Sequence, residues 1–458
     1  MKRTFSPDSL HDIEARLDQA QKAFHLQYPG ESGGRRPVHV VYGGAQLFKS
    51  GIARRLGDLA LRSMDEYAPD FAAFAKALDL HGAGRLSGEN DSEWFARTIH
   101  ERVREKLQRE PVEDLRIDFE DGYGIRPDAE EDGHAAAAAS ELAQGMNLGA
   151  LPPFIGIRVK AFSAEHRKRA IRTLDIFLTE LAGKTRGELP EHFCITLPKV
   201  AMPEEVAALA DICARIEPTL DLKPGVLRIE LMIERMQAIF NERGGANLPA
   251  LVNAARGQCV ALHFGPYDYA ASRKVITQVP LEHFASDFAR EVMQVSLAGT
   301  DVRLGDGPTN IMPIPPHRAE KDGPPLTAPQ KEENLSAVHR AWRLHFHNVR
   351  RSLANGFYQG WDLHPAQLPA RYAAVYSFFL ENIDSMGKRL RNFVDQATQA
   401  TRIGQVFDDA AMAQGLMNFF QQGIVCGAIT PEDAHDRTGL ALAEIRAASF
   451  AKIVEGRH

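Results

Sequence analysis

Two acidic residues, Glu234 and Asp268, each follow a short apolar run of the sequence and are of the type that binds a metal ion. If the two runs are neighbouring parallel strands, which lie about 4.8 Å apart, both carboxylates can reach one ion. Carboxylates without His or Cys favour Mg²⁺, with Mn²⁺ as the alternative, while water and substrate oxygens fill the remaining positions. The competing interpretation is that Glu234 caps a helix and Asp268 only ends a loop. Glu230 has the same strand parity as Glu234 but would lie about 13 Å deeper, so Glu234 is the better ligand.

Arg158 lies in another such run and would present its guanidinium group at the same edge. An arginine there can bind a substrate carboxylate through two parallel hydrogen bonds. It can equally form a salt bridge to Asp118, Glu120 and Asp121, which end the preceding run, and both roles can hold at once. Three carboxylates so close together repel one another unless a cation offsets them. We therefore expect Glu120 and Asp121 to orient Arg158 or metal-bound water.

Three further residues at the ends of runs are candidates for contact with a substrate. Lys199 can bind an anion, although a surface lysine is the plainer interpretation. Gly265 and Pro266 lead into Asp268 and are expected to line the substrate position. His263 lies inside an apolar run, and we expect it to be a hydrogen-bonded core histidine.

These residues need a frame that brings many strand ends to one edge, and the sequence predicts eight strands. Short β-type runs alternate with helical stretches, most of them at the spacing that one strand–helix unit requires. Such alternation indicates a parallel sheet, and eight units suggest an α/β fold closed into a (β/α)₈ TIM barrel with catalytic groups at the carboxyl ends of the strands. A doubly wound open sheet is the alternative. The seventh run contains Pro313 and is the weakest strand. The predicted strands are residues 38–42, 115–120, 154–160, 193–199, 226–234, 259–264, 310–314 and 359–363.

The spacing also predicts how the chain is divided. The gap between the first two strands is too long for one unit, so we place a helical insertion at about 70–110, with the glycine-rich residues 82–88 as its joint. We assign residues 1–395 to the barrel with this insertion. Residues 396–458 have helical periodicity and are assigned to a C-terminal helical extension.

Composition narrows the functional class. Of the 458 residues, 44% are hydrophobic and 25% charged, as in ordinary globular proteins. The net charge of −6 argues against a nucleic-acid binder. No apolar run is long enough to span a membrane, and no signal peptide follows the first residues. The four cysteines are far apart and form no CxxC pair, so we expect a cytoplasmic protein.

Six segments in this order resemble the citrate lyase β-subunit/malyl-CoA lyase family of the HpcH/HpaI aldolase superfamily. They cover most of the predicted barrel, and the last is the most distinctive. The segments are IDFEDG (117–122), IGIRV (155–159), TLPKV (196–200), LMIE (231–234), FGPYD (264–268) and NGFYQGWDLHPAQL (355–368).

The resemblance implies a TIM barrel in which Glu234 and Asp268 hold one Mg²⁺ and Arg158 holds the carboxylate or carbonyl of a small acid. Enzymes of this kind break or form a C–C bond beside a carbonyl, often on a CoA thioester, and they commonly form trimers or hexamers. Such a reaction passes through an enolate, whose negative oxygen a divalent ion and an arginine stabilise. The expected protein is therefore a lyase or aldolase that assembles as a homo-oligomer.

The chain departs from the family at its first strand. Members that use CoA usually follow that strand with a Pro-Gly-Ser-Arg-like turn, whereas residues 42–49 read YGGAQLFK and lack the arginine. This difference argues against CoA binding and for a free acid as substrate. Two alternatives stay open: a phosphoryl-transfer enzyme of the phosphoenolpyruvate/pyruvate barrel type, and a regulatory barrel without catalysis.

Overall fold

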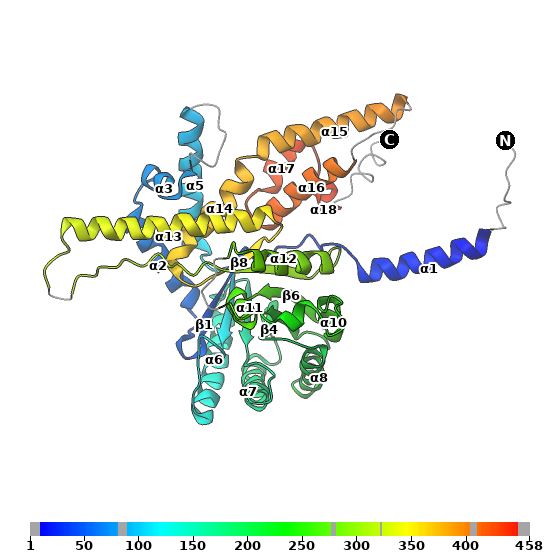
Figure 1. Ribbon diagram of the computed structural model, residues 1–458, viewed down its shortest axis with the longest axis horizontal. Coiled ribbons are helices and arrows are strands. Elements are labelled where there is room, and N and C mark those ends of the chain that lie inside the picture. The colour runs from blue at the N-terminus through cyan, green and yellow to red at the C-terminus, as the bar shows by residue number, and fades with distance from the viewer. Residues whose placement is uncertain (1–9, 81–88, 276–280, 321–322, 404–409, 448–458) are drawn as a thin grey trace.

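Eight parallel strands close into a barrel in the order of the chain (Figure 1). The computed structural model describes residues 10–80, 89–275, 281–320, 323–403 and 410–447. Each strand pairs with the next one along the chain, and β8 pairs back with β1. The predicted (β/α)₈ barrel is therefore confirmed. The strands are β1 His39–Gly44, β2 Asp114–Asp118, β3 Phe154–Arg158, β4 His192–Leu197, β5 Arg228–Ile233, β6 Cys259–Phe264, β7 Arg303–Pro308 and β8 Gln359–Asp362.

The prediction for the seventh strand was wrong. Residues 310–314 form no strand, and β7 lies a few residues earlier, at Arg303–Pro308. The two glycines of β7 lie where neighbouring side chains leave no room for a Cβ atom. A Cβ atom on Gly305 would lie 2.2 Å from Nδ1 of His263, and one on Gly307 would lie 2.4 Å from Cδ of Pro266. The strand is thus built from residues that are normally depleted in strands.

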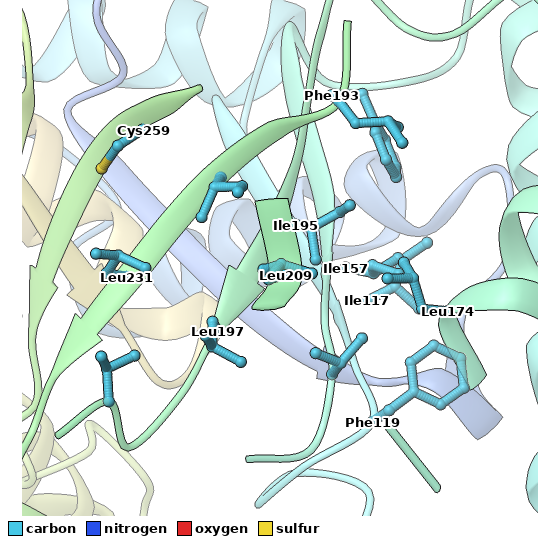
Figure 2. Close-up of a cluster of buried hydrophobic side chains, with 14 of the residues drawn as sticks. Ile117, Phe119, Ile157, Leu174, Phe193, Ile195, Leu197, Leu209, Leu231 and Cys259 are labelled. Carbon is cyan, nitrogen blue, oxygen red and sulfur yellow. The ribbon is translucent and has the colours of Figure 1, made fainter. Parts of the chain in front are cut away.

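The outer wall of the barrel packs against helices through aliphatic side chains. Ile117, Ile157 and Ile195 on three successive strands are fully buried and meet Leu174 and Leu209 from the covering helices (Figure 2). This core fixes the strands and therefore the positions of their carboxyl ends. The helices that follow the strands include α6 Asp128–Leu148, α7 Arg167–Thr185, α8 Pro203–Thr219, α9 Met236–Ile239, α10 Leu248–Ala254, α11 Pro266–Ser272, α12 Phe284–Leu297, α13 Ala328–Ala354 and α14 Leu368–Leu380.

The inside of the barrel, in contrast, holds a network of charged and polar side chains. Arg116 donates to Glu230 at 2.9 Å and also bonds Asp114, while Thr196 donates to Glu230 at 2.7 Å. Burial raises the pKa of Glu230, but Arg116 lowers it more, to about 2. Glu230 is therefore a structural anion deep in the barrel.

The segment between β1 and β2 and the C-terminal helices share a second hydrophobic core with α13 and α14. Residues 82–88, predicted as a joint, lie outside the described residues. The predicted boundary after residue 395 falls inside α15, and the division into a barrel and an extension stays a prediction. The helices are α2 Ile52–Tyr67, α3 Phe71–Leu78, α5 Glu89–Arg109, α15 Ile383–Ile403, α16 Ala410–Val425, α17 Pro431–Thr438 and α18 Leu442–Ala447, with short 3₁₀ turns at η2 Ala45–Leu47 and η3 Pro365–Gln367.

One helix stands apart from both cores. Helix α1, His11–Gln27, extends away from the barrel beyond the end of α12 (Figure 1). Within the described residues, no helix combines the length and the apolar character that crossing a bilayer requires.

Candidate functional site

Glu234 and Asp268 come together at the carboxyl end of the barrel. Glu234 directly follows β5, and Asp268 lies in the first turn of α11, just after β6. The two strands are parallel neighbours, and the N–H of Gly265 donates to the carbonyl of Ile233 at 3.0 Å, which continues the pairing to the rim. The structure thus gives the two carboxylates the positions that the sequence predicts for a metal site.

The surroundings of Glu234 disfavour a bare negative charge. Its side chain is only 2% exposed, and one carboxyl oxygen, Oε1, has no hydrogen-bond partner. Burial raises the pKa of Glu234 well above its usual range, and hydrogen bonding and repulsion from Asp268 raise it further. A buried polar atom without a partner is costly. A cation between the two carboxylates would satisfy it.

Gly265 leaves the space that Glu234 occupies. A Cβ atom on Gly265 would lie 2.3 Å from Cγ of Glu234, so any larger residue would displace the carboxyl group. Pro266 begins α11 at a position where its missing N–H costs nothing. These two residues therefore set the backbone path from Glu234 to Asp268, and their contact with a substrate stays a prediction.

Arg158 is fully engaged by the preceding strand. Its Nε and Nη2 donate to Asp118 at 2.7 and 2.6 Å, and its Nη1 lies 3.3 Å from Glu120. The guanidinium group also lies over the rings of Tyr42 and Trp361. Burial lowers the pKa of Arg158, but the bonds and charge of Asp118 offset this and hold the pKa above its ordinary value. The remaining nitrogen, Nη1, lies near Glu120 and donates to Sδ of Met232 at 3.4 Å.

Lys199 lies among the rim carboxylates. Its ammonium group bonds Glu120, lies 3.0 Å from Asp121 and lies 3.7 Å from Asp268. Lys199 has a left-handed backbone with φ of 55°, which few non-glycine residues adopt. Burial lowers the pKa of Lys199, but the hydrogen bond and charge of Glu120 raise it more, so the side chain stays charged. The ammonium group that was expected to bind an anion of the substrate is thus already paired.

The two acidic residues beside Lys199 differ in their proton affinity. Burial raises the pKa of Glu120, and the charges of Arg158 and Lys199 only partly offset this. Asp121 is more exposed, and the attraction of Arg158 and Lys199 outweighs its burial and lowers its pKa. Glu120 is therefore the better of the two to hold a proton.

A cavity of about 410 Å³ opens beside this cluster. Its lining is mixed in charge and includes three cations of the rim. Lys160 is paired with Glu131 at 2.8 Å, whereas the exposed side chain of Arg235 makes no hydrogen bond or ion pair with any described residue. The volume suits a small acid. The charged lining residues are Glu120, Asp121, Lys160, Glu165, Lys199 and Arg235, and His166 lies among them.

The donor set at the rim fits Mg²⁺ or Mn²⁺ better than a softer metal. Across the described part of the chain, His, Cys, Asp and Glu form no group of three or more that could hold an ion. One or two carboxylates are what Mg²⁺ usually takes from a protein when water and substrate complete its shell, and here one of the two carboxylates has an unbonded oxygen. Glu234 and Asp268 are the residues that fit such an ion.

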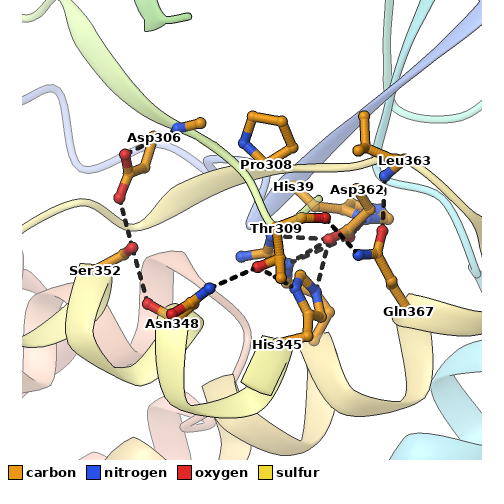
Figure 3. A network of polar contacts seen from close by, with 12 residues as sticks. His39, Asp306, Pro308, Thr309, His345, Asn348, Ser352, Asp362, Leu363 and Gln367 are labelled. Carbon is orange, nitrogen blue, oxygen red and sulfur yellow. Dashed lines mark hydrogen bonds and ion pairs between the residues drawn. The ribbon is translucent and has the colours of Figure 1, made fainter. Parts of the chain in front are cut away.

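A second polar network lies on the outer side of the barrel, which the sequence did not predict. Asp362, at the end of β8, accepts from Nδ1 of His39 at 2.7 Å and from Arg371 at 2.8 Å, and Nε2 of His345 lies 2.9 Å away (Figure 3). The backbone N–H of Glu113 donates to Nε2 of His39, which fixes the Nδ1–H tautomer. The network joins β1, β8 and α13. An acidic residue between the apolar Trp361 and Leu363 was the only signal in the sequence.

Comparisons with known proteins agree with this fold. The family model described as Domain of unknown function (DUF6986) matches residues 17–453. No curated protein matches the chain. A solved citrate lyase from Burkholderia xenovorans LB400 is 15% identical with a TM-score of 0.52, covering 88% of this chain and 96% of that chain.

Two other solved structures are more distant. The magnesium/glyoxylate complex of Haloferax volcanii malate synthase is 15% identical with a TM-score of 0.42 and covers 81% of this chain and 94% of its own. The protein CitE from Mycobacterium tuberculosis, in complex with magnesium and pyruvate, is 14% identical with a TM-score of 0.38 and covers 75% and 92%. The citrate lyase match confirms, for the fold, the resemblance seen in the sequence.

Proposed function

The chain belongs to the family described as Domain of unknown function (DUF6986), and we propose that it is a magnesium-dependent lyase or aldolase that breaks or forms a C–C bond in a small hydroxy or keto acid. One observation carries the proposal. Glu234 is buried at the mouth of the barrel, faces Asp268, and keeps one carboxyl oxygen without a partner. Such an arrangement is costly without a cation and suited to one.

The remaining rim residues support this reaction class. A divalent ion held by Glu234 and Asp268 would polarise the carbonyl oxygen beside the bond that reacts. Arg158 adds a fixed positive charge, because Asp118 holds two of its nitrogens and leaves Nη1 near Glu120. Positive charges fixed in advance stabilise a developing enolate without reorganisation. Glu120, whose pKa is raised, is the residue that we assign to proton transfer.

Arg235 supplies a binding group for the far end of the substrate. It immediately follows Glu234, lines the cavity beside the site, and has no partner among the described residues. A guanidinium group in that position can bind a second carboxylate. We therefore place the substrate among short acids with two anionic groups.

A free acid fits the site better than a CoA thioester. Two of the three cations that follow the turn after β1 are already engaged: Lys49 lies 2.9 Å from Glu141, and Arg54 donates to the carbonyl of Gln108 at 2.9 Å. The four cysteines are free and buried, which fits the reducing cytoplasm. We propose a cytoplasmic enzyme on this basis.

Titration calorimetry with Mg²⁺ and Mn²⁺, followed by pyruvate, oxaloacetate and malate in the presence of the metal, tests the proposal. We expect metal binding in the unmodified protein, a marked loss in Glu234→Gln and Asp268→Asn, and keto-acid binding only with metal. Cleavage of a C–C bond is then assayed over a panel of hydroxy acids. Unchanged metal affinity in both variants would refute the metal site. Metal-dependent nucleotide binding without keto-acid binding would favour phosphoryl transfer instead.

A further inference from the structure

Helix α1 presents a row of apolar side chains that no described residue of its own chain covers. All 17 residues of α1 are exposed, although Ile13, Leu17 and Phe24 share one face of the helix. A helix of this length is only marginally stable alone in water. A partner surface is therefore needed to keep it folded.

Helix α12 carries a second uncovered row. This row points away from the barrel and consists of Phe284, Phe288 and Val295. The exposed fractions of the six side chains in the α1 and α12 rows lie between 43% and 78%. Two phenylalanines and a valine in one line on a barrel helix form an apolar patch of the kind that marks an interaction site. The ring of Phe240 extends the patch, with its centroid 6.0 Å from that of Phe288.

The two rows have the same spacing. In α1, Leu17 and Phe24 follow Ile13 by four and eleven positions. In α12, Phe288 and Val295 follow Phe284 by the same numbers of positions. The position seven residues after the first is Glu291 in α12 and the small Ala20 in α1. Two helices whose apolar residues repeat at equal intervals can pack side by side along their whole rows.

We propose that α1 docks on α12 of a second copy of this chain, so that two copies exchange their N-terminal helices. Within one chain α1 is held away from its own α12, because the segment after it is fixed to the loop beyond α12. Gly30 donates to the carbonyl of Gly299 at 2.8 Å, and Ser32 to Asp301 at 2.9 Å. From this anchor α1 continues outward, past the end of α12 (Figure 1).

A second copy is the occupant that these observations fit best. Each copy supplies both a free row and a row to receive it, so one symmetric contact covers all four rows at once. Exchange of an identical element between copies is a low-cost route to an oligomer. The proposal is independent of the reaction at the rim, since it uses no residue of that site.

Cross-linking of single-cysteine variants tests which chain α1 contacts. The native cysteines are all buried and will not compete. We expect a mixture of Leu17→Cys and Phe288→Cys proteins, under mild oxidation, to give a disulfide product that holds one chain of each. Leu26→Cys serves as the control, because Leu26 is 85% exposed on the opposite side of α1 and should not cross-link to the α12 variant. A disulfide only within one chain that carries both substitutions would overturn the proposal.

Sedimentation equilibrium gives a second, independent test. We expect the unmodified protein to sediment as an oligomer of at least two chains. Leu17→Arg should raise the dissociation constant of the oligomer by tenfold or more, whereas Leu26→Arg should leave this constant unchanged. Circular dichroism checks that both variants keep the barrel. A monomer at all concentrations, or an oligomer that Leu17→Arg leaves intact, would refute the exchange.

Discussion

The carboxyl group of Glu234 lies against that of Asp268 at the mouth of the barrel, and Oε1 of Glu234 has no hydrogen-bond partner. Burial and the nearby Asp268 together hold the pKa of Glu234 well above its usual range. Its ionised form is therefore a cost to the fold in the absence of a cation. A carboxylate held at such a cost is what the proposed metal site would require.

Replacing Glu234 by Gln should remove metal binding without weakening the fold. The change keeps the shape of the side chain and removes a charge that the fold disfavours, so the melting temperature without metal should stay the same or rise. The loss of one of two metal ligands should weaken Mg²⁺ binding by more than about tenfold, since even outer-shell changes cost that much. Calorimetry and thermal unfolding measure the two effects.

Glu230, on the same strand, provides the matched comparison. It is bonded to Arg116 and Thr196 deep in the barrel. Glu230→Gln would remove one of the two carboxylates that pair with the buried Arg116, and breaking a buried ion pair costs up to about 3–5 kcal/mol. We expect this variant to melt at a clearly lower temperature, the opposite of Glu234→Gln. Equal effects in the two variants would show that Glu234 is structural.

Gly265→Ala should displace the carboxyl group of Glu234 by a steric clash. The added methyl group would lie 2.3 Å from Cγ of Glu234, so the side chain must move out of its position. Overpacking of this kind costs about 1–3 kcal/mol, and Mg²⁺ affinity should fall with it. Gly43→Ala is the control, because a Cβ atom there meets nothing within 4 Å. Crystallography or calorimetry that finds the metal site unchanged in Gly265→Ala would contradict this account.

The barrel could be predicted from the sequence because six of its eight strands lie in runs rich in apolar and β-branched residues, and the eighth, QGWD, was placed partly through the family resemblance. The exception, β7, has the sequence RLGDGP, and two glycines and a proline normally indicate a loop. Its glycines are explained only by side chains from elsewhere, His263 beside Gly305 and Pro266 beside Gly307. Local propensity contains no information about these contacts.

The positions of the candidate site residues could be predicted in the same way, while their roles stay predictions. Residues at strand ends could be placed at one rim, because parallel strands bring their carboxyl ends together. The spacing could not predict which charged side chains at the rim form ion pairs with one another. Lys199 was expected to meet an anionic substrate, yet its ammonium group lies among Glu120, Asp121 and Asp268, which depends on the left-handed backbone at Lys199 itself.

Lys199→Met should tighten metal binding. The ammonium group lies 3.7 Å from Asp268 and opposes a divalent ion there. Removing a unit charge at such a distance is worth about 1 kcal/mol even in water, or about fivefold in affinity. Calorimetry at two salt concentrations measures the change, and the difference between variant and unmodified protein should shrink at high salt. Weaker Mg²⁺ binding in the variant would mean that Lys199 instead holds the carboxylates in place.

Asp362 should be essential for stability although it takes no part in the proposed chemistry. Burial raises the pKa of Asp362, but the charge of Arg371 and the hydrogen bonds of His345 and His39 lower it more, to well below its ordinary value of 3.8. Because the pKa is lower in the folded state, this interaction stabilises the protein above pH 3.8, and the stabilisation is lost as the pH falls through the folded-state value. Asp362→Asn leaves the buried Arg371 unpaired and should cost about 3–5 kcal/mol at neutral pH.

The variant should also lose part of the acid dependence of unfolding. Denaturant unfolding measured from pH 7 downward should show a smaller fall in the free energy of unfolding below pH 3.8 for Asp362→Asn than for the unmodified protein. Asp384→Asn is the control, because Asp384 is exposed and, among the described residues, pairs with Arg437 alone at the surface. It should change stability by no more than about 0.5 kcal/mol. If both variants unfold alike, the network around Asp362 does not tie β1, β8 and α13 together.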